Sequence, residues 1–328
     1  MVVMKKIALT IGEPGGIGPE VAIKAAISPE VVSNCHPIIV GKKSIIQRAL
    51  RLLNLPLKLR TISSPKSITK RSGTIDIIDI QEEGHYKEGQ PSKGGGLISY
   101  LCIERAVKLA LSGEVYGLST APISKESLKL AGLPWPGHTE MLAELTSTKD
   151  YAMVLVGGGL RVILVTIHTS LRSVPNLLTK KNIFRTILLA KRACLMFGIE
   201  TPEIAVSGLN PHAGESGMFG TEEAELIKPA IERARAEGIS VSGPYPPDTI
   251  FYKALKGEFD IVVCMYHDQG LIPIKLLAFE SGVNITVGLP IIRTSPDHGT
   301  AFDIAWRGVA NPSSMIEAVK LAVTLRRV

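Results

Sequence analysis

The sequence predicts an α/β protein whose sheet is largely parallel. Short apolar runs alternate with longer segments of helical periodicity almost throughout the chain, a pattern that favours parallel strands joined by right-handed crossovers. Hydrophobic residues make up 45% of the chain but aromatic residues only 5%, so the core must consist mainly of Ile, Val, Leu and Ala. Such side chains are typical of parallel strands covered by helices on both faces.

The elements follow from the period of the apolar residues. The expected strands are Lys6–Ile11, Pro37–Val40, Thr74–Ile80, Val115–Ser119, Met153–Val156, Val162–Ile167, Glu203–Ser207, Asp260–Met265 and Val283–Val287. The expected helices are one that begins near Pro19 and then Lys43–Leu53, Leu97–Leu111, Asn182–Phe197, Glu222–Ala236, Ala301–Trp306 and Ser314–Leu325. A chain of 328 residues is long enough for two medium domains. The Gly- and Pro-rich stretches Ala131–Gly137 and Gly288–Pro296 are expected to be the crossings between two subdomains, 1–128 with 297–328 and 129–296.

Charge and cysteine content exclude several classes of partner. The net charge is +7, but the basic residues are scattered and interleaved with acids, which argues against a nucleic-acid surface and suits small anions such as phosphates, or solubility alone. The cysteines Cys35, Cys102, Cys194 and Cys264 are far apart and indicate buried thiols in a reducing compartment. No apolar stretch approaches the roughly 18 residues of a membrane helix, and no signal-peptide pattern is present. We therefore expect a cytoplasmic protein that binds neither nucleic acid nor membrane.

Three histidines share one topological position. His168, His212 and His267 each close or follow a predicted strand. In open α/β sheets, ligands bind just beyond the carboxyl ends of the strands. Each histidine taken alone could equally cap a helix or make a local hydrogen bond. Because the same position recurs three times, the pattern favours a three-histidine metal site with open coordination positions.

The segment Gly12–Glu20 joins the first strand to the first helix and contains Gly12, Gly15, Gly16 and Gly18. Glycines at the start of a helix allow backbone N–H groups to approach an anion. The segment lacks the Gly-Lys-Ser/Thr of a phosphate-binding loop and does not match the dinucleotide-binding spacing. A tight structural turn would explain these glycines equally well.

A second group of residues is suited to an anionic substrate. Lys275, Asn284 and Arg293 recur at intervals of nine residues and provide a cation, an amide and a guanidinium. They could instead be solvated surface residues, although Arg293 follows an apolar run and is expected at a strand end. His138 and Thr139 stand at a predicted helix start, where His138 could bind an anion, act in acid–base chemistry or cap the helix.

These segments together resemble the 4-hydroxythreonine-4-phosphate dehydrogenase family. The resemblance runs in order across nearly the whole chain, and the blocks Asn210–Glu215 (NPHAGE) and Tyr266–Gly270 (YHDQG) make it specific. The stretch Asp297–Ala305 (DHGTAFDIA), together with the early GGIGPE, is also similar to isocitrate and isopropylmalate dehydrogenases. Those enzymes bind NAD or NADP without a dinucleotide-binding domain of the usual kind. The resemblance therefore implies two α/β subdomains with a cleft between them, the first on the cofactor side and the second carrying substrate, metal and dimer contacts.

The resemblance also implies the chemistry. A divalent metal (zinc, or alternatively Mg, Co, Ni or Mn) would be held by His168, His212 and His267, with the last residue contributed by the second subunit of a homodimer. NAD, with NADP as the alternative, would accept hydride from 4-phosphooxy-L-threonine, and loss of CO2 would give 3-amino-2-oxopropyl phosphate in pyridoxine 5′-phosphate biosynthesis. The implied substrate contacts are His138, Thr139, Lys275, Asn284 and Arg293. The implied cofactor contacts are Gly12, Gly15, Gly16, Gly18, Gly288, His298, Gly299, Thr300 and Asp303.

His138, Asp248 and Asp268 are the candidates for proton transfer, and the two aspartates could instead support a metal ligand. One departure from the family is Trp306, which stands where Gly is usual and could crowd the adenine end of the cofactor. Three alternatives stay open. The first is the same chemistry on 4-phosphothreonate, 4-phosphoerythronate or a dihydrodiol dicarboxylate. The others are a three-histidine metallohydrolase and a phosphate-binding protein without enzymatic activity.

Overall fold

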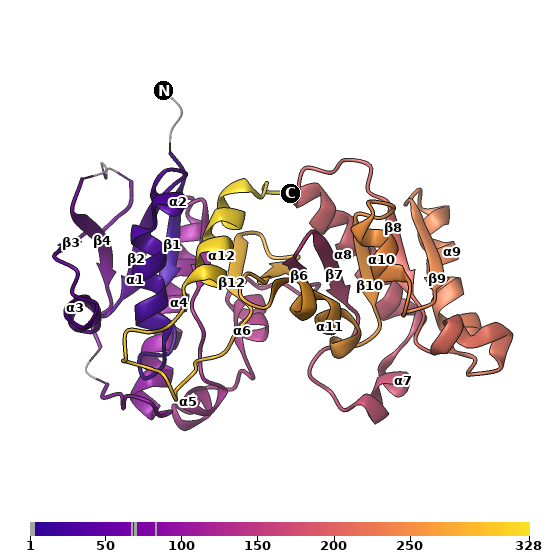
Figure 1. Ribbon diagram of the computed structural model, residues 1–328, viewed down its shortest axis with the longest axis horizontal. Helices are drawn as coiled ribbons and strands as arrows, with labels where there is room; N and C mark the ends of the chain where they lie inside the picture. Colours follow the sequence, from indigo (N-terminus) through magenta and orange to yellow (C-terminus); the bar gives the residue numbers. More distant parts are fainter. Residues whose placement is uncertain (1–3, 67, 69–70, 83) are drawn as a thin grey trace. The chain divides into compact units, whose positions relative to one another are not determined.

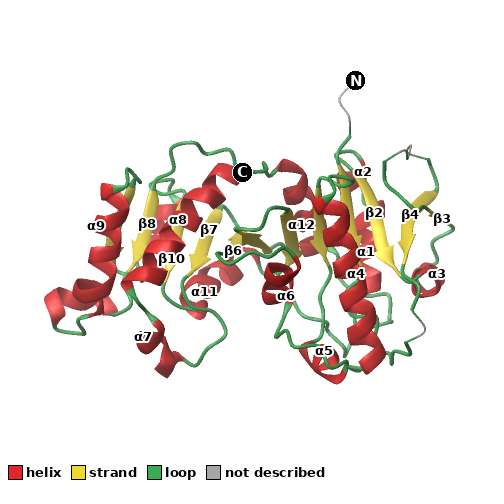
Figure 2. Cartoon of the chain, turned by 180° about the vertical axis from the view of Figure 1, so that it is seen from behind, coloured by secondary structure: helices red, strands yellow, loops and turns green. Residues whose placement is uncertain are grey.

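The computed structural model describes residues 4–66, 68, 71–82 and 84–328, and it confirms the α/β class (Figures 1 and 2). The chain divides into two compact units. Unit 1 extends to Lys149 and resumes at Leu289–Leu325, whereas unit 2 comprises Asp150–Gly288 and Arg326–Val328. The first crossing thus follows Lys149 rather than residue 128. The second falls after Gly288, inside the Gly- and Pro-rich stretch expected for it.

In the part of unit 1 that the structure describes, the strands follow the order β3-β4-β2-β1-β5-β12. They are β1 (Lys6–Thr10), β2 (His36–Gly41), β3 (Lys58–Thr61), β4 (Thr74–Asp79), β5 (Gly117–Thr120) and β12 (Ile292–Pro296). All five pairings are parallel. Its helices are α1 (Gly18–Ile27), α2 (Pro29–Val32), α3 (Lys43–Leu52), α4 (Lys93–Leu111), α5 (Lys125–Leu130), α6 (His138–Leu145) and α12 (Ser313–Thr324). The carboxyl ends of β1, β5 and β12 therefore meet at one edge of the sheet, where ligands bind in such folds.

Unit 2 contains the strands in the order β11-β6-β7-β10-β8-β9. They are β6 (Ala152–Gly157), β7 (Leu160–Leu164), β8 (Ile204–Ser207), β9 (Val241–Tyr245), β10 (Ile261–Cys264) and β11 (Val283–Val287). Strand β6 runs antiparallel to β11 and β7, and the other pairings are parallel. The helices are α7 (Val174–Leu177), α8 (Lys180–Met196), α9 (Lys228–Ala236), α10 (Ile250–Leu255) and α11 (His267–Ala278).

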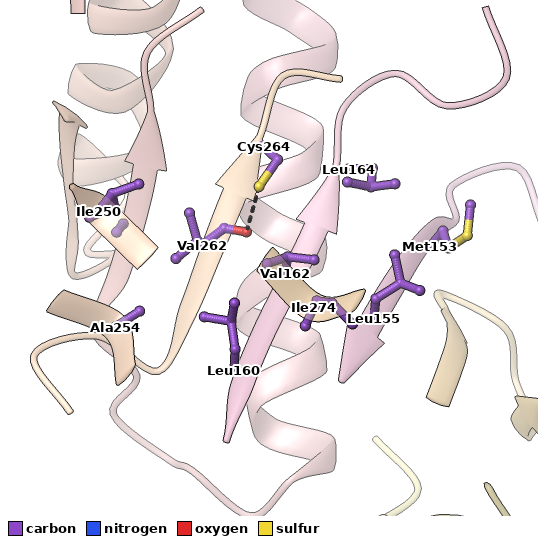
Figure 3. Packing of buried hydrophobic residues seen from close by; sticks show 11 residues of the cluster. Met153, Leu155, Leu160, Val162, Leu164, Ile250, Ala254, Val262, Cys264 and Ile274 are labelled. Atoms are coloured by element: carbon purple, nitrogen blue, oxygen red, sulfur yellow. Dashed lines mark hydrogen bonds between the residues drawn. The ribbon is translucent and has the colours of Figure 1, made fainter. Parts of the chain in front are cut away.

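The core of unit 2 fixes the strand ends that carry the candidate histidines. Figure 3 shows Val162 of β7 and Val262 of β10 on neighbouring strands, with Ile274 of α11 beside Leu155 of β6. All four side chains are fully buried. Burial of a side chain of this size stabilises the fold by about 1.5–3 kcal/mol. The packing therefore holds α11, and with it the start of this helix, in a defined position on the sheet.

Several sequence expectations need correction. Ala301–Trp306 was expected to be a helix, but these residues form turns, because Ala301 and Trp306 have φ of 42° and 60°, in the left-handed region. Strands β3, β9 and β12 were not predicted, since β3 is largely solvent-exposed, β9 contains Gly and Pro, and β12 lies in the Gly- and Pro-rich stretch expected to be a crossing. Helix α11 was missed as well, and it contains Pro273. The four cysteines are buried and form no disulfide, and no helix in the described part of the chain is long and apolar enough to cross a membrane.

A buried acid ties the outer strands of unit 1 together. Asp76 of β4 is 4% exposed and accepts hydrogen bonds from Arg60 of β3, with Nη2 2.7 Å from Oδ2. Nε2 of His36, on β2, lies 2.6 Å from the same oxygen. Burial alone would raise the pKa of Asp76, but the hydrogen bonds and charges of Arg60 and His36 outweigh it and hold the pKa below its ordinary value.

Replacement of Asp76 by asparagine is expected to lower the free energy of unfolding by about 3 kcal/mol at neutral pH, because it leaves the Arg60 guanidinium without its counter-charge and His36 without its carboxylate partner. A carboxyl with a lowered pKa stabilises the fold above its unfolded pKa and loses this effect as the pH falls. The difference between Asp76→Asn and wild type should therefore begin to shrink below about pH 4 and vanish once the pH falls below the lowered pKa of Asp76. Urea unfolding at a series of pH values measures it.

The matched control is Asp150→Asn, whose side chain is 69% exposed and lies 3.6 Å from Arg185. This exposed pair is expected to contribute less than about 1 kcal/mol. Equal effects of the two substitutions at neutral pH would contradict the role given to Asp76.

Candidate active site

Two of the three strand-end histidines lie side by side in unit 2. His168 follows β7, and His267 is the first residue of α11, soon after β10. Because β7 and β10 are neighbouring parallel strands, their carboxyl ends bring the two imidazole rings to a centroid distance of 5.6 Å. Together with Asp268 they line a pocket of about 550 Å³.

The third histidine, His212, lies in the turn that follows β8. Its ring packs against Phe219, with the ring centroids 6.3 Å apart. Among the described residues, no three His, Cys, Asp or Glu side chains are grouped closely enough to hold a metal ion. Within one chain the structure thus brings together His168 and His267, and a site made of all three histidines stays a prediction.

The donor atoms around His267 suit a transition metal. Asp268 Oδ1 lies 2.7 Å from His267 Nδ1, so a proton on Nδ1 leaves Nε2 as the nitrogen that can bind a metal. Neutral imidazoles are good ligands for zinc, cobalt and nickel. The residues present therefore fit the divalent metal that the family resemblance implies, with Asp268 orienting one ligand.

The loop that carries His212 has a strained backbone. Five successive residues, His212 to Ser216, have φ between 41° and 84°, in the left-handed region, and only Gly214 among them is glycine. The left-handed conformation costs a residue with a Cβ about 1–2 kcal/mol. The four other residues of the turn together therefore cost roughly 4–8 kcal/mol, which neighbouring contacts must offset.

The buried carboxylate of Glu223 provides such contacts. Its Oε1 accepts hydrogen bonds from the backbone N–H groups of Leu209, at 2.8 Å, and Asn210, at 2.7 Å. Its Oε2 accepts a third from Asn210 Nδ2 at 3.0 Å. Hydrogen bonds to a charged group contribute about 1.5–3 kcal/mol each. Their sum is similar to the cost of the left-handed turn.

The remaining candidates of unit 2 are dispersed. Asn284 of β11 is half-buried, with Nδ2 3.0 Å from Met153 Sδ, and its buried Oδ1 has no hydrogen-bond partner among the described residues. Lys275 projects from α11, with Nζ 5.4 Å from the centroid of the Phe279 ring. Asp248 is exposed just before α10. Gly288 has φ of 102°, and a Cβ there would meet the carbonyl oxygen of Asp150 at 2.2 Å. The backbone conformation and this close contact therefore explain why the residue is glycine.

A compact cationic group lies in unit 1. Arg293 is 1% exposed and lies within β12 rather than at its end; its Nε and Nη2 donate to Thr120 Oγ1 at 3.2 and 2.9 Å. Burial lowers the pKa of Arg293 to about 9, which still leaves it a cation at neutral pH. Burial and the nearby charge of Arg293 hold the pKa of His138 well below its ordinary value. His138 is therefore neutral, and its buried Nε2 has no hydrogen-bond partner in the described part of the chain.

This arrangement can bind an anion and accept a proton. A buried guanidinium attracts a phosphate or carboxylate strongly because little water screens it. A neutral imidazole beside it can accept a hydrogen bond or a proton from a bound hydroxyl group. Thr139, 9% exposed, follows His138 at the start of α6, where the helix N-terminus also favours negative charge.

The glycine loop between β1 and α1 is packed tightly against its surroundings. A Cβ at Gly12 would lie 2.2 Å from the Pro122 carbonyl oxygen, and one at Gly18 would lie 2.1 Å from that of Ile11. Glu13, a residue to which the sequence assigned no role, is fully buried, and its Oε1 accepts from the Gly15 N–H at 3.0 Å. Burial raises the pKa of Glu13. Close packing of the backbone is therefore sufficient to explain Gly12 and Gly18.

The segment from Asp297 to Gly308 is hydrogen-bonded to this glycine loop. The Ile17 N–H donates to the Thr300 carbonyl oxygen at 3.0 Å. Trp306 donates from Nε1 to the Pro14 carbonyl oxygen at 2.8 Å and stacks on Tyr86 at a centroid distance of 6.0 Å. Trp306 thus packs on protein atoms of unit 1, and its effect on cofactor choice stays untested. On the same segment, His298 Nδ1 lies 3.1 Å from the Gly299 carbonyl oxygen, and Asp303 is exposed.

Sequence reasoning missed three residues of these groups: Glu13, Thr120 and Glu223. Thr120 ends a predicted strand beside Ala121 and Pro122, so its position at the sheet edge could have singled it out. Glu223 is an acid near the start of a predicted helix, and only its burial distinguishes it from a solvated one. Its role follows from contacts with residues more than ten positions away.

Comparison with known proteins gives matches over nearly the whole chain. Residues 33–322 match the family described as "Pyridoxal phosphate biosynthetic protein PdxA". A 4-hydroxythreonine-4-phosphate dehydrogenase of Desulforapulum autotrophicum is 48% identical, over 96% of this chain and 94% of its own. A D-threonate 4-phosphate dehydrogenase of Pectobacterium atrosepticum is 46% identical, over 98% and 99%. The crystal structure of 4-hydroxythreonine-4-phosphate dehydrogenase from Klebsiella pneumoniae has a TM-score of 0.91 and 46% identity, with 98% of both chains covered.

Proposed function

Since the chain belongs to the pyridoxal phosphate biosynthetic protein PdxA family and is a dehydrogenase, we propose that it oxidises 4-phosphooxy-L-threonine at its hydroxyl group with NAD. Decarboxylation then gives 3-amino-2-oxopropyl phosphate, a step in pyridoxine 5′-phosphate synthesis in the cytoplasm. The observation that carries the proposal is the near full-length identity of 48% to a dehydrogenase named for this substrate. NADP is the alternative cofactor.

The residues of both units support this chemistry. Arg293 and Thr120 would bind an anionic group of the substrate, and neutral His138 would take up the hydroxyl proton. Lys275, Asn284 and Thr139 would contribute further substrate contacts. His168, His212 and His267 would hold the divalent metal, with zinc as the first candidate, and Asp268 would orient His267. When bound, the metal would supply Lewis acidity toward the substrate oxygen, and NAD would accept hydride.

Most of the proposed cofactor contacts lie around the glycine loop of unit 1, and Gly288 belongs to unit 2. Two residues proposed as cofactor contacts, Gly16 and Thr300, are neighbours in space, since a Cβ on Gly16 would lie 2.7 Å from the Thr300 carbonyl oxygen. The others are Gly12, Gly15, Gly18, Gly288, His298, Gly299 and Asp303. Asp248 is retained as a candidate for proton transfer.

We further propose a homodimer with a shared active site. Helix α11, which begins at His267, exposes large apolar side chains: Ile272 is 60% exposed and Leu276 81%, and Phe279 at its end is 75% exposed. Apolar side chains clustered in this way are typical of protein interfaces. A second copy of the chain that covers α11 would bring its own surface next to His267, and this supports a site completed across the interface.

A second substrate has support from the relatives. Two of the proteins similar to this chain, at 46% and 45% identity, are named D-threonate 4-phosphate dehydrogenases. That compound differs from 4-phosphooxy-L-threonine in having a hydroxyl in place of the amino group, and Arg293 would suit the anionic groups of either. 4-Phosphoerythronate and a dihydrodiol dicarboxylate are further candidates, and a metal-dependent hydrolase is the remote one.

The test is NADH formation, followed by absorbance, with purified protein, NAD, a divalent metal and 4-phosphooxy-L-threonine. We expect NADH with this substrate and its loss after chelation of the metal. A signal only with D-threonate 4-phosphate or 4-phosphoerythronate would assign the protein to the sister activity. No NADH with any of these substrates, from protein shown to contain metal, would contradict the proposal.

A further inference from the structure

We propose that Glu223 is the residue that positions His212, by holding the left-handed turn on which His212 stands. The inference rests on the proposed role of His212 as a metal ligand. Glu223 is 3% exposed and opens the π-helical turn Glu223–Ile227, one turn before α9. π-Helical turns of this kind often occur at functional sites.

The contacts of Glu223 reach the left-handed turn from two sides. Oε1 accepts hydrogen bonds from the backbone N–H groups of Leu209 and Asn210, at the start of the loop. Oε2 lies under the middle of the turn, since a Cβ on Gly214 would approach it to 2.7 Å. The Asn210 carbonyl oxygen in turn accepts from the Ala213 N–H at 3.1 Å. One carboxylate thus connects Leu209 and Asn210, which precede His212, with Gly214, which follows it.

A carboxylate is required at this position because three donors converge on it. Two are backbone N–H groups and the third is Asn210 Nδ2, which also lies 2.8 Å from Glu222 Oε2. Glutamine would point its NH2 group at one of these donors, and aspartate is one methylene too short to reach both sides. Without the third hydrogen bond the left-handed conformation of His212, at φ 51°, is no longer held, and the imidazole loses its fixed direction.

The positions of metal ligands depend on such outer contacts, and their loss typically weakens metal affinity by about 10–100-fold. We therefore expect Glu223→Gln to weaken zinc binding by about this factor. Zinc affinity is measured on the full-length protein by competition with a chromophoric chelator. Hydrogen exchange of the backbone amides in residues 208–220 is measured in parallel and should become faster in the variant, while the exchange of β7 and β10 stays the same.

The matched control is Glu225→Gln, since Glu225 lies on the same π-helical turn but is exposed. It should leave zinc affinity and loop exchange at wild-type values. Glu223→Asp keeps the charge and shortens the side chain, so it should give an intermediate loss. It also serves as the test variant if Glu223→Gln is not recovered in folded form.

The outcomes decide whether Glu223 positions His212. A folded Glu223→Gln with wild-type zinc affinity and wild-type loop exchange would overturn the proposal, even if its melting temperature were lower. If wild-type protein itself bound neither zinc nor another divalent metal, the proposed metal site would fail. Faster exchange of residues 208–220 in Glu223→Gln alone would in that case still support Glu223 as the residue that holds His212 in place.

Discussion

His168→Ala is expected to lower kcat/KM by about 10³-fold or more and to remove the bound metal, because a metal ion contributes several kcal/mol of transition-state stabilisation. His168 is exposed, so its replacement should leave the melting temperature unchanged. Metal content by atomic spectroscopy and steady-state kinetics measure the two effects. His85→Ala is the matched control, since His85 is also exposed and has no proposed role. Full metal content in His168→Ala would exclude this histidine as a ligand.

The same variant tests whether the active site is shared between subunits. His267→Ala is expected to be as inactive as His168→Ala. When the two inactive proteins are mixed and allowed to exchange subunits, half of the dimers are mixed, and each has one intact site if His267 acts on the neighbouring chain. About a quarter of wild-type activity should then return. No recovery, with subunit exchange demonstrated, would show that His168 and His267 act within one chain, as their ring distance of 5.6 Å would also allow.

Arg293→Lys is the second substitution with a large expected effect. It should raise KM for the phosphorylated substrate by about 10²-fold, since loss of a buried partner in a charged contact costs about 2–5 kcal/mol. Lysine cannot reproduce the planar guanidinium, whose Nε and Nη2 both donate to Thr120 Oγ1 and whose delocalised charge suits an anionic group. Steady-state kinetics and the inhibition constant of inorganic phosphate measure the loss.

The control for Arg293→Lys is Arg51→Lys, in the last turn of α3, where the side chain is exposed. It should leave both constants unchanged. A wild-type KM in a folded Arg293→Lys would show that the substrate anion binds elsewhere. Lys275, a half-buried residue of α11, would then be the next residue to test.

Local sequence patterns were sufficient for most elements of the fold. Strand β10 is a run of four apolar residues, and β1, β4 and β11 are rich in Ile, Val or Leu, so the burial of these strands could be read from the chain directly. The position of His168 and His267 just after strands was predicted for the same reason. Prediction failed at Ala301–Trp306, where the apolar spacing suits a helix but the left-handed residues at both ends of the segment prevent one.

What the sequence by itself determined was the α/β class, the family and the residue types available for chemistry, because periodicity and motif blocks depend only on neighbours along the chain. Only the tertiary structure decided which of those residues meet. The strand order placed β7 beside β10 and so paired His168 with His267, and it set Arg293 of β12 against Thr120 of β5. The tertiary structure also decided that Glu223 is buried beneath the turn that carries His212. These contacts join residues 13 to 173 positions apart, and their free energy arises from burial, which no local pattern records.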